Sequence, residues 1–427
     1  MAQCRMSVAL VGAPTAIRTH RPWRRPGSID LAGGDRLYLV SRRVSNHGVF
    51  MSKAMFFVGS CNRVLPYFAT ANGRGIGAFR IDTVTGEIET LGVAEGIDNP
   101  TYLATAPDGI SLSATSEVLG WNEGTISACA IDAKSGALIY LNKQPTRGNI
   151  AAHLSYDATG RFVAVANYSM LPTTSKPNQS VVICPRSADG ALAAPVAEVS
   201  HSGIGLDRVR QERSHAHSAR WTPNNRFLVV ADLGTDQLVL YKFDAATGAL
   251  CWHSVTPLPP GSGPRHIAFH PARSFVYSAN ELSSSVASLS FDEDAGILSL
   301  LAVRASLPEG EIGHSHCSAI KVSRNGRHLF VGNRGHDSIG CFDIDPASGI
   351  ATLRETVPAG GKTPRDLEFD PSGNLLAVAN QDSDRVNFFS YDSANGELAE
   401  FGTPLTTGTP TAVTFYPGST AQVSDLS

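Results

Sequence analysis

A unit of about 52 residues recurs along this 427-residue chain and restricts it to repeat architectures. Each unit holds an anchor residue, an apolar strand, a turn related to Pro-Asp-Gly and a second apolar strand, as in PRHIAFHPARSFVYSANE and PRDLEFDPSGNLLAVANQ. Alignment on the turn gives spacings of 51, 65, 48, 53, 47 and 46 residues between successive anchors. The anchors are Thr101, Ala152, His217, Arg265, Ser318, Arg365 and Thr411.

A second hairpin follows each of these units, with a turn of the form D-x-x-x-G, as in FRIDTVTGEIETL and YKFDAATGALCWH. Four short strands in a repeat of about 52 residues are typical of a β-propeller blade. The G-H and W-D marks of WD40 repeats are missing, which indicates another propeller class. We therefore predict an all-β fold, a seven-bladed β-propeller with four antiparallel strands per blade.

The two ends of the repeat region complete each other. Residues 56–61 (FFVGSC) resemble the second strand of a blade, and PTAVTFYPG near the C-terminus resembles a first strand. Pairing them in one blade closes the ring and removes the exposed sheet edges. The predicted organisation is a basic, disordered extension at 1–54, a propeller at 55–418 and a tail at 419–427. A transit peptide and an over-long start are the alternatives for the extension.

Charge is distributed unevenly between the extension and the propeller. Residues 1–54 hold nine basic and two acidic residues, a net charge of +7, so the rest of a chain with net charge −3 carries −10. An acidic body repels phosphate backbones, so nucleic acid is not an expected partner. No run of about 18 apolar residues occurs, so no membrane partner is expected. The seven cysteines form no C-x-x-C pair and predict reduced thiols in a cytoplasmic protein.

Both ends of each first hairpin are expected at one edge of its sheet, so the anchor and the residue 16 positions later share one face of the ring. This second column contains Glu117, Tyr168, Leu233, Glu281, Arg334, Gln381 and Cys61. The residues directly after the anchors are Tyr102, His153, Ser218, His266, Ala319, Asp366 and Ala412. Elsewhere the repeats are uniform and apolar, whereas these positions supply three Arg, three His and two Glu. Such variation predicts a site on this face, with strand-end caps and ion pairs between blades as the alternative.

The spacing of 65 residues marks an insertion ahead of His217 that ends in HSGIGLDRVRQERSHAH. We expect this segment to cover the site as a lid, with Arg208, Arg210 and Arg213 steering an anion. A solvated basic loop is the alternative interpretation.

Four motifs occur in order along the repeats: RQERSHAH, GPRHIAFHP followed by SANEL, GNRGHDSI and PRDLEFDPSGNLLAVANQDS. Over about residues 56–417 the chain resembles the lactonase family of seven-bladed β-propellers, which includes 6-phosphogluconolactonases and 3-carboxy-cis,cis-muconate lactonizing enzymes. The resemblance implies catalytic roles for His217, Arg265, Glu281 and Arg334. The two columns select the same residues.

Hydrolysis of a lactone needs a base that activates water and cations that stabilise the tetrahedral oxyanion. We expect His217 to be the base, with Glu281 orienting it or sharing the proton transfer. Arg265 and Arg334 are expected to stabilise the developing negative charge. The predicted substrate-binding residues are Arg365 and Arg210, for a phosphate or carboxylate, and His266, His153, Glu117 and Gln381.

The expected function is hydrolysis of a sugar lactone, 6-phosphogluconolactone to 6-phosphogluconate, by a monomer or simple homo-oligomer that needs no cofactor. One alternative is a lactonizing cycloisomerase that acts on a carboxymuconate-type lactone and moves a proton at carbon. Another is a non-catalytic propeller that binds a partner. The partner-binding alternative is weakened because the columns contain only Tyr102 and Tyr168 as aromatic residues.

A metal-dependent reaction is the main chemical alternative. Its ligands would come from His217, His266, His316 and Glu281. The neighbouring cations Arg265 and Arg334 disfavour a bound divalent ion, so we expect no metal at the site.

Overall fold

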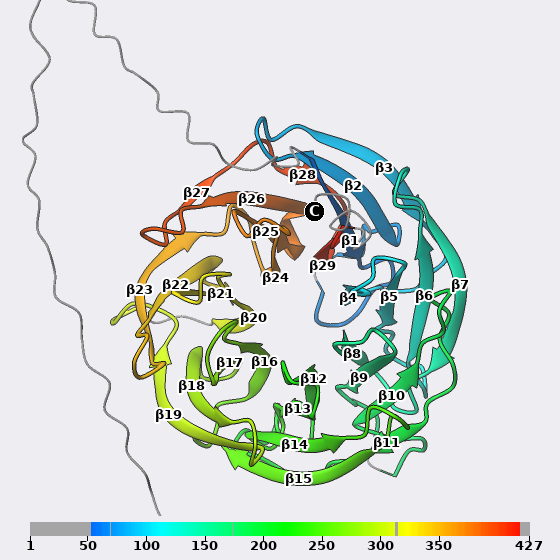
Figure 1. Cartoon of the computed structure of the whole chain (residues 1–427), viewed down its shortest axis with the longest axis vertical. Helices are drawn as coiled ribbons and strands as arrows, with labels where there is room; N and C mark the ends of the chain where they lie inside the picture. Colours follow the sequence, from blue (N-terminus) through cyan, green and yellow to red (C-terminus); the bar gives the residue numbers. More distant parts are fainter. Residues whose placement is uncertain (1–52, 69, 173, 312–314, 419–427) are drawn as a thin grey trace, which may run out of the picture. The chain divides into compact units, whose positions relative to one another are not determined.

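The computed structural model describes residues 53–68, 70–172, 174–311 and 315–418, whose strands form seven antiparallel sheets. Six sheets have four strands, and one carries a fifth, β28 (Leu405–Thr406), beside its third strand. The sheets stand around a central axis as blades (Figure 1). The predicted seven-bladed β-propeller is therefore confirmed. The predicted tail and residues 1–52 of the predicted extension lie outside the described residues, and β1 begins at Lys53.

Each blade places one strand at the axis and one at the rim (Figure 1). The innermost strands are β4 (Leu103–Thr105), β8 (Ala151–Tyr156), β12 (Ala216–Trp221), β16 (Pro264–Phe269), β20 (His316–Val322), β24 (Pro364–Phe369) and β29 (Pro410–Phe415). The second strands are β5 (Ser111–Ser116), β9 (Phe162–Asn167), β13 (Phe227–Asp232), β17 (Phe275–Asn280), β21 (His328–Arg334), β25 (Leu375–Asn380) and β1 (Lys53–Ser60).

The third and fourth strands form the outer hairpin of each blade. The third strands are β6 (Thr125–Ile131), β10 (Val181–Pro185), β14 (Gln237–Phe243), β18 (Ser285–Asp292), β22 (Ser338–Ile344), β26 (Arg385–Tyr391) and β2 (Ile76–Asp82). The fourth strands are β7 (Leu138–Pro145), β11 (Ala197–Val199), β15 (Leu250–Pro257), β19 (Ile297–Ala305), β23 (Ala351–Pro358), β27 (Leu398–Glu400) and β3 (Ile88–Ala94). One 3₁₀ turn, η1 (Gln381–Ser383), follows β25. Within the described ranges, no helix has the length and apolar character needed to cross a membrane.

Six of the seven outer hairpins share one turn, which explains the recurring D-x-x-x-G. In the blade that holds both ends of the propeller, Asp82 Oδ1 accepts hydrogen bonds from the backbone N–H of Val84 (2.9 Å) and Thr85 (3.0 Å). The N–H of Gly86 donates to the Asp82 carbonyl at 2.8 Å, and Gly86 has a φ of +77°, which glycine adopts without steric cost. The same pair recurs as Asp132 and Gly136, Asp244 and Gly248, Asp292 and Gly296, Asp345 and Gly349, and Asp392 and Gly396.

Hydrophobic packing lies between the blades. Seven clusters of buried side chains each join two adjacent blades, so every blade is held by its two neighbours. In one cluster the fully buried Phe56 ring lies 5.4 Å from that of Phe79, 5.4 Å from Phe388 and 5.6 Å from Phe415. Phe388 belongs to the preceding blade, so these aromatic contacts join the first described strand to the end of the repeat region.

The ring is closed by antiparallel pairing of β1 with β29. Phe56 pairs with Phe415, Phe57 with Thr414 and Val58 with Val413. The resulting sheet has the order β29-β1-β2-β3, so the C-terminal strand is the innermost strand of a blade whose other strands come from the N-terminal side. The predicted closure is confirmed in this register.

We predict that Phe56→Ala lowers the free energy of unfolding by about 3–5 kcal/mol, because it empties a fully buried site between the closing blade and its neighbour. Urea unfolding followed by intrinsic fluorescence measures the change. Tyr140→Ala on β7 is the control, since Tyr140 is 54% exposed, and its effect is expected to stay within about 0.5 kcal/mol. Equal shifts of the unfolding midpoint in the two variants would contradict the prediction.

Candidate active site

A β-bulge places the anchor residues of five innermost strands outside the regular pairing. In β12 the register passes from Ala216 opposite Asp232 to Ser218 opposite Ala231, which leaves His217 as the extra residue. The same irregularity leaves Ala152, Arg265, Arg365 and Thr411 without a pairing partner in their strands. Because a bulge redirects the side chain of its extra residue, the anchors are separated from the residues that follow them. A repeated backbone irregularity thus builds the face that the two columns predicted.

A cavity of about 420 Å³ lies at this edge of the ring. Its lining residues come from the anchors, the second column, the insertion and the loops: Tyr67, Glu117, Ile150, Ala152, Tyr168, Met170, Arg210, His217, Glu281, His316, Arg334 and Arg365. Six of the predicted site residues are among them. Arg265 lies behind the wall on Glu281, and Gln381 accepts a hydrogen bond from Arg365 at 3.4 Å. His153 and His266 line a second, smaller cavity.

Glu281 is the acceptor around which three arginines gather. Its carboxylate lies 2.5 Å from Arg210 Nη2, 2.7 Å from Arg334 Nη2 and 3.1 Å from Arg265 Nε, although the last contact is poorly directed as a hydrogen bond. Burial opposes ionisation of Glu281, but these guanidinium groups prevail and hold its pKa well below the usual value. Glu281 is therefore ionised at neutral pH. Its contacts with three arginines favour an orienting role over proton transfer.

His217 is buried at the floor of this cavity. Burial and the cation of Arg265 hold the pKa of His217 well below its usual value, so the imidazole is neutral at pH 7. Its Nδ1 has no hydrogen-bond partner among the residues that the structure describes. The ring of Tyr168 meets it edge to face, with centroids 5.5 Å apart. A neutral imidazole with an unused nitrogen fits the role of a proton acceptor.

Arg365 is the least engaged of the four arginines at the site. Its Nη2 lies 3.7 Å from Glu117, beyond normal hydrogen-bond length, and its Nη1 makes one long bond to Gln381. The guanidinium carbon lies 4.8 Å from the centre of the Phe68 ring, a cation–π arrangement. The planar group is thus held from its face, which leaves its N–H donors available to an anion.

Tyr67 and Phe68 belong to the loop between β1 and β2, and the repeat alignment did not single them out. The Tyr67 hydroxyl donates to Glu117 at 2.7 Å, and Thr101 Oγ1 donates to the other carboxylate oxygen at 2.8 Å. The corresponding connections differ in length from blade to blade, from residues 335–337 to residues 61–75, so the column alignment has no matching position for Tyr67 and Phe68. Tyr67 and Phe68 of this loop therefore hold the Glu117 carboxylate and one face of the Arg365 guanidinium in place.

The insertion ahead of β12 contributes one arginine to the cavity. Asp207 Oδ1 accepts the backbone N–H groups of Val209 (2.9 Å) and Arg210 (3.1 Å), and this turn directs Arg210 towards Glu281. Arg213 is buried and donates to the carbonyl of Leu171, and Arg208 is exposed. Of the three arginines predicted to steer an anion, Arg210 alone lines the cavity.

No group of three or more His, Cys, Asp or Glu side chains that could hold a metal ion occurs within residues 53–68, 70–172, 174–311 and 315–418. His217, His266, His316 and Glu281 therefore do not converge as a ligand set. His316 Nδ1 lies 3.3 Å from the Glu281 carbonyl oxygen, a backbone contact.

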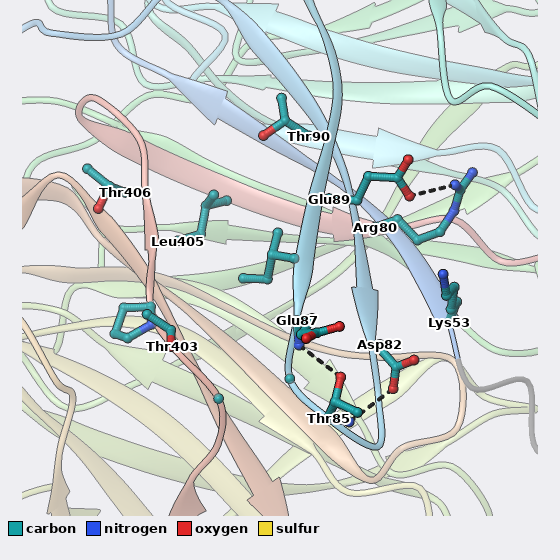
Figure 2. Close-up of a pocket in the computed structure, with 14 residues that line it drawn as sticks. Lys53, Arg80, Asp82, Thr85, Glu87, Glu89, Thr90, Thr403, Leu405 and Thr406 are labelled. Atoms are coloured by element: carbon teal, nitrogen blue, oxygen red, sulfur yellow. Dashed lines mark hydrogen bonds and ion pairs between the residues drawn. The ribbon is translucent and has the colours of Figure 1, made fainter.

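A larger open groove of about 650 Å³ lies beside the outer strands of the closing blade, between the β2–β3 hairpin and residues 402–406 (Figure 2). Three of its five charged side chains, those of Arg80, Asp82 and Glu89, are engaged. Arg80 pairs with Glu89 at 3.0 Å, and Asp82 holds its own turn (Figure 2). The other two, Lys53 and Glu87, are exposed to solvent. Exposed charges without strongly perturbed surroundings offer little for catalysis, so we place the candidate active site in the smaller cavity at the axis.

Comparison with known proteins agrees with this architecture. The family described as "Lactonase, 7-bladed beta-propeller" matches residues 55–415. The chain is 34% identical to a 6-phosphogluconolactonase of Bacillus subtilis over 86% of its own length and 99% of the relative's, and 30% identical to one of Formosa agariphila over 80% and 94%. The structure of a periplasmic gluconolactonase of Pseudomonas aeruginosa superimposes with a TM-score of 0.76 at 31% identity, covering 86% of this chain and 99% of that one.

Fold and site define a propeller enzyme of the lactonase class. The chain belongs to the seven-bladed β-propeller lactonase family.

We predict that the enzyme continues to hydrolyse lactones at pH values well below 6.5. The expected base is the neutral form of His217, and its depressed pKa keeps it unprotonated as the pH falls through the usual histidine range. Measuring kcat/KM from about pH 5 to pH 8, corrected for spontaneous hydrolysis, locates the acidic limb. A half-maximal value at or above pH 6.5 would show that His217 is not the controlling base or is not shielded as described.

Proposed function

We propose that the chain hydrolyses 6-phosphogluconolactone to 6-phosphogluconate. The observation that best supports this proposal is the excess of cationic side chains at the axial cavity. Arg210, Arg334 and Arg365 line it and Arg265 lies behind it, against the carboxylates Glu117 and Glu281, which leaves two positive charges beside a neutral His217. Two positive charges suit a phosphate dianion. The relatives named 6-phosphogluconolactonase supply the substrate for this proposal.

In the proposed reaction His217 takes a proton from a water molecule whose oxygen attacks the lactone carbonyl carbon. The carbonyl oxygen becomes an oxyanion, which Arg334 and Arg265 stabilise from positions fixed by Glu281. Collapse of this intermediate breaks the bond from carbon to the ring oxygen. The proton then passes from His217 to the departing oxygen, and the hydroxy acid leaves as a carboxylate after it ionises.

Arg365 is assigned to the phosphate of the substrate, because its N–H donors are less engaged than those of the other arginines. Arg210 reaches the cavity from the insertion and donates to Glu281. Its contact with Glu281 ties the insertion to the group that orients the other arginines. Substrate binding and the position of this segment are thereby connected.

We also place the enzyme in the cytoplasm. The described cysteines are free thiols, five of them buried: Cys61, Cys129, Cys184, Cys317 and Cys341, with Cys251 exposed. Burial raises the pKa of the Cys61 thiol to about 12, which keeps it protonated and unreactive at neutral pH. Protonated, buried thiols support a reducing compartment.

We predict that His217→Ala lowers kcat for 6-phosphogluconolactone by about 100-fold or more, because the general base is lost. Hydrolysis is followed by pH-stat titration with the spontaneous rate subtracted. His253→Ala, on the outer strand β15, is the control and should retain wild-type activity. Normal turnover by His217→Ala would refute the assignment. Turnover of a carboxymuconate lactone and not of the phosphorylated sugar by the wild type would move the function to the cycloisomerase alternative.

We predict that Arg365→Met raises KM for 6-phosphogluconolactone by about tenfold or more, while KM for unphosphorylated gluconolactone changes little, because a charge-assisted contact to phosphate is lost. Parallel kinetics on the two lactones measure the difference. Arg385→Met changes an exposed arginine at the start of β26 of the same blade and serves as the control. Equal losses on both lactones would remove Arg365 from the phosphate site.

A further inference from the structure

A second cavity of about 200 Å³ lies deeper along the central axis. Its charged lining residues, Arg220, Lys321 and Glu368, each stand three positions after an anchor. At about 3.3 Å per residue this places them roughly 10 Å along the innermost strands, away from the active-site edge. Residues one position after the anchors line it too, and lie between it and the active site: Tyr102, His153 and His266.

The two histidines of this cavity each present an N–H without an acceptor. The backbone N–H of Ala219 donates to His153 Nδ1 at 3.4 Å, so the proton of the neutral ring is on Nε2. Arg265 Nη1 lies 3.3 Å from His266 Nε2 and can only donate, so the His266 proton is on Nδ1. Both side chains are more than nine-tenths buried, at 1% and 7% exposure. Neither remaining N–H has an acceptor among the residues that the structure describes.

The other polar groups of the cavity reinforce this excess of donors. Arg220 is half-buried and makes no hydrogen bond or ion pair with any described residue, and the hydroxyl of Tyr102 likewise has no partner within the described ranges. Lys321 is engaged with Glu368 at 2.6 Å, so these two charges cancel. The cavity lining therefore has a net charge of +1, which is that of Arg220. Buried donors without acceptors are costly unless a ligand or water supplies the missing oxygen atoms.

Asp366 is the other acidic group near this lining. Its oxygens accept the backbone N–H groups of Val413 and Leu367, both at 3.0 Å, so it is used in joining β24 to the closing strand β29. Burial raises the pKa of Asp366 to about 6, which indicates that no cation compensates it fully. Asp366 does not line the cavity and offers no partner to the two imidazoles or to Arg220.

We propose that this cavity is a second binding site, specific for a small oxyanion, a carboxylate or a phosphate. Arg220 binds two oxygens of the ion as a fork, and the His153 Nε2–H, His266 Nδ1–H and Tyr102 hydroxyl donate to its oxygens. The volume of about 200 Å³ is below the roughly 300 Å³ at which sites for larger organic ligands begin, so a phosphorylated sugar does not fit. The site takes an ion of acetate or phosphate size with accompanying water.

The new site shares a wall with the active site. His266 donates into the second cavity through Nδ1 and accepts from Arg265 through Nε2. An anion bound at Nδ1–H makes Nε2 a stronger acceptor and so holds Arg265 more firmly on the catalytic side. This coupling rests on the proposed role of Arg265 in lactone hydrolysis, whereas the binding site itself does not.

Titration calorimetry of the full chain with inorganic phosphate, and separately with acetate, tests the site. The variants are Arg220→Met, which removes the fork, and Arg220→Lys, which keeps the charge. Arg365→Met removes an anion contact of the active site. Arg226→Met is the matched control, because Arg226 is exposed, follows β12 in the same blade and pairs with Asp294. Lactonase activity in buffer free of phosphate and carboxylates shows that each Arg220 variant is folded.

We expect Arg220→Met to lose one binding event for phosphate, acetate or both, with affinity reduced about tenfold or more, while Arg226→Met binds as the wild type does. Arg220→Lys should bind at intermediate strength, since a lysine lacks the bidentate geometry. The loss must also appear in the Arg365→Met background, which separates the second site from the active site. Unchanged stoichiometry and affinity in Arg220→Met, or no binding of either ion beyond the active-site event, would overturn the proposal.

Discussion

Pairing of β1 with β29 is the constraint on which the rest of the molecule depends. Each blade buries its faces only against its neighbours, so an open ring would leave two apolar faces and two sheet edges in water. The active site depends on the same closure, because Tyr67 of the closing blade holds Glu117 of the next blade in the ring. An interaction between the two ends of the propeller therefore fixes a side chain at its axis. The same strand pairing therefore determines both the stability of the fold and the geometry of the site.

The β-bulges divide the axis into two chemical layers. In a regular strand, successive side chains point to opposite faces of the sheet. An anchor and the residue after it would then point to opposite faces of the same blade. The extra residue instead directs His217, Arg265 and Arg365 to the catalytic edge, while His153 and His266 line the layer below. The irregularity recurs in five blades, so the scaffold itself separates the anchors from the residues that line the second cavity.

The fold and much of the site follow from the sequence because each blade repeats the same local physics. The Asp-to-Gly turn, the apolar strand pairs and the split closing blade are all visible as repeated residues, and the structure has them as predicted. The columns also located the edge where Glu117, His217 and Arg334 meet.

The sequence does not reveal those features of the site that do not repeat from blade to blade. Tyr67 and Phe68 lie in a connection whose length varies from blade to blade, and the direction of Arg210 depends on a turn within the single insertion. The separation of His153 and His266 from the catalytic edge depends on the bulge, which spacing alone cannot reveal.

Electrostatics explain why the imidazole of His217, the proposed base, is weakly basic. Burial, together with Arg265, holds the pKa of His217 down, and burial lowers the pKa of Arg265 to about 9, which still leaves that arginine charged at neutral pH. Glu281 limits the repulsion among Arg210, Arg265 and Arg334, so the cations stay together without a substrate. An anionic substrate adds the negative charge that this arrangement lacks, and so raises the proton affinity of His217 as the reaction begins. The negative charge that develops on the lactone carbonyl oxygen raises the proton affinity of His217 further. In the proposed reaction the basicity of His217 therefore increases at the stage at which a proton is taken from water.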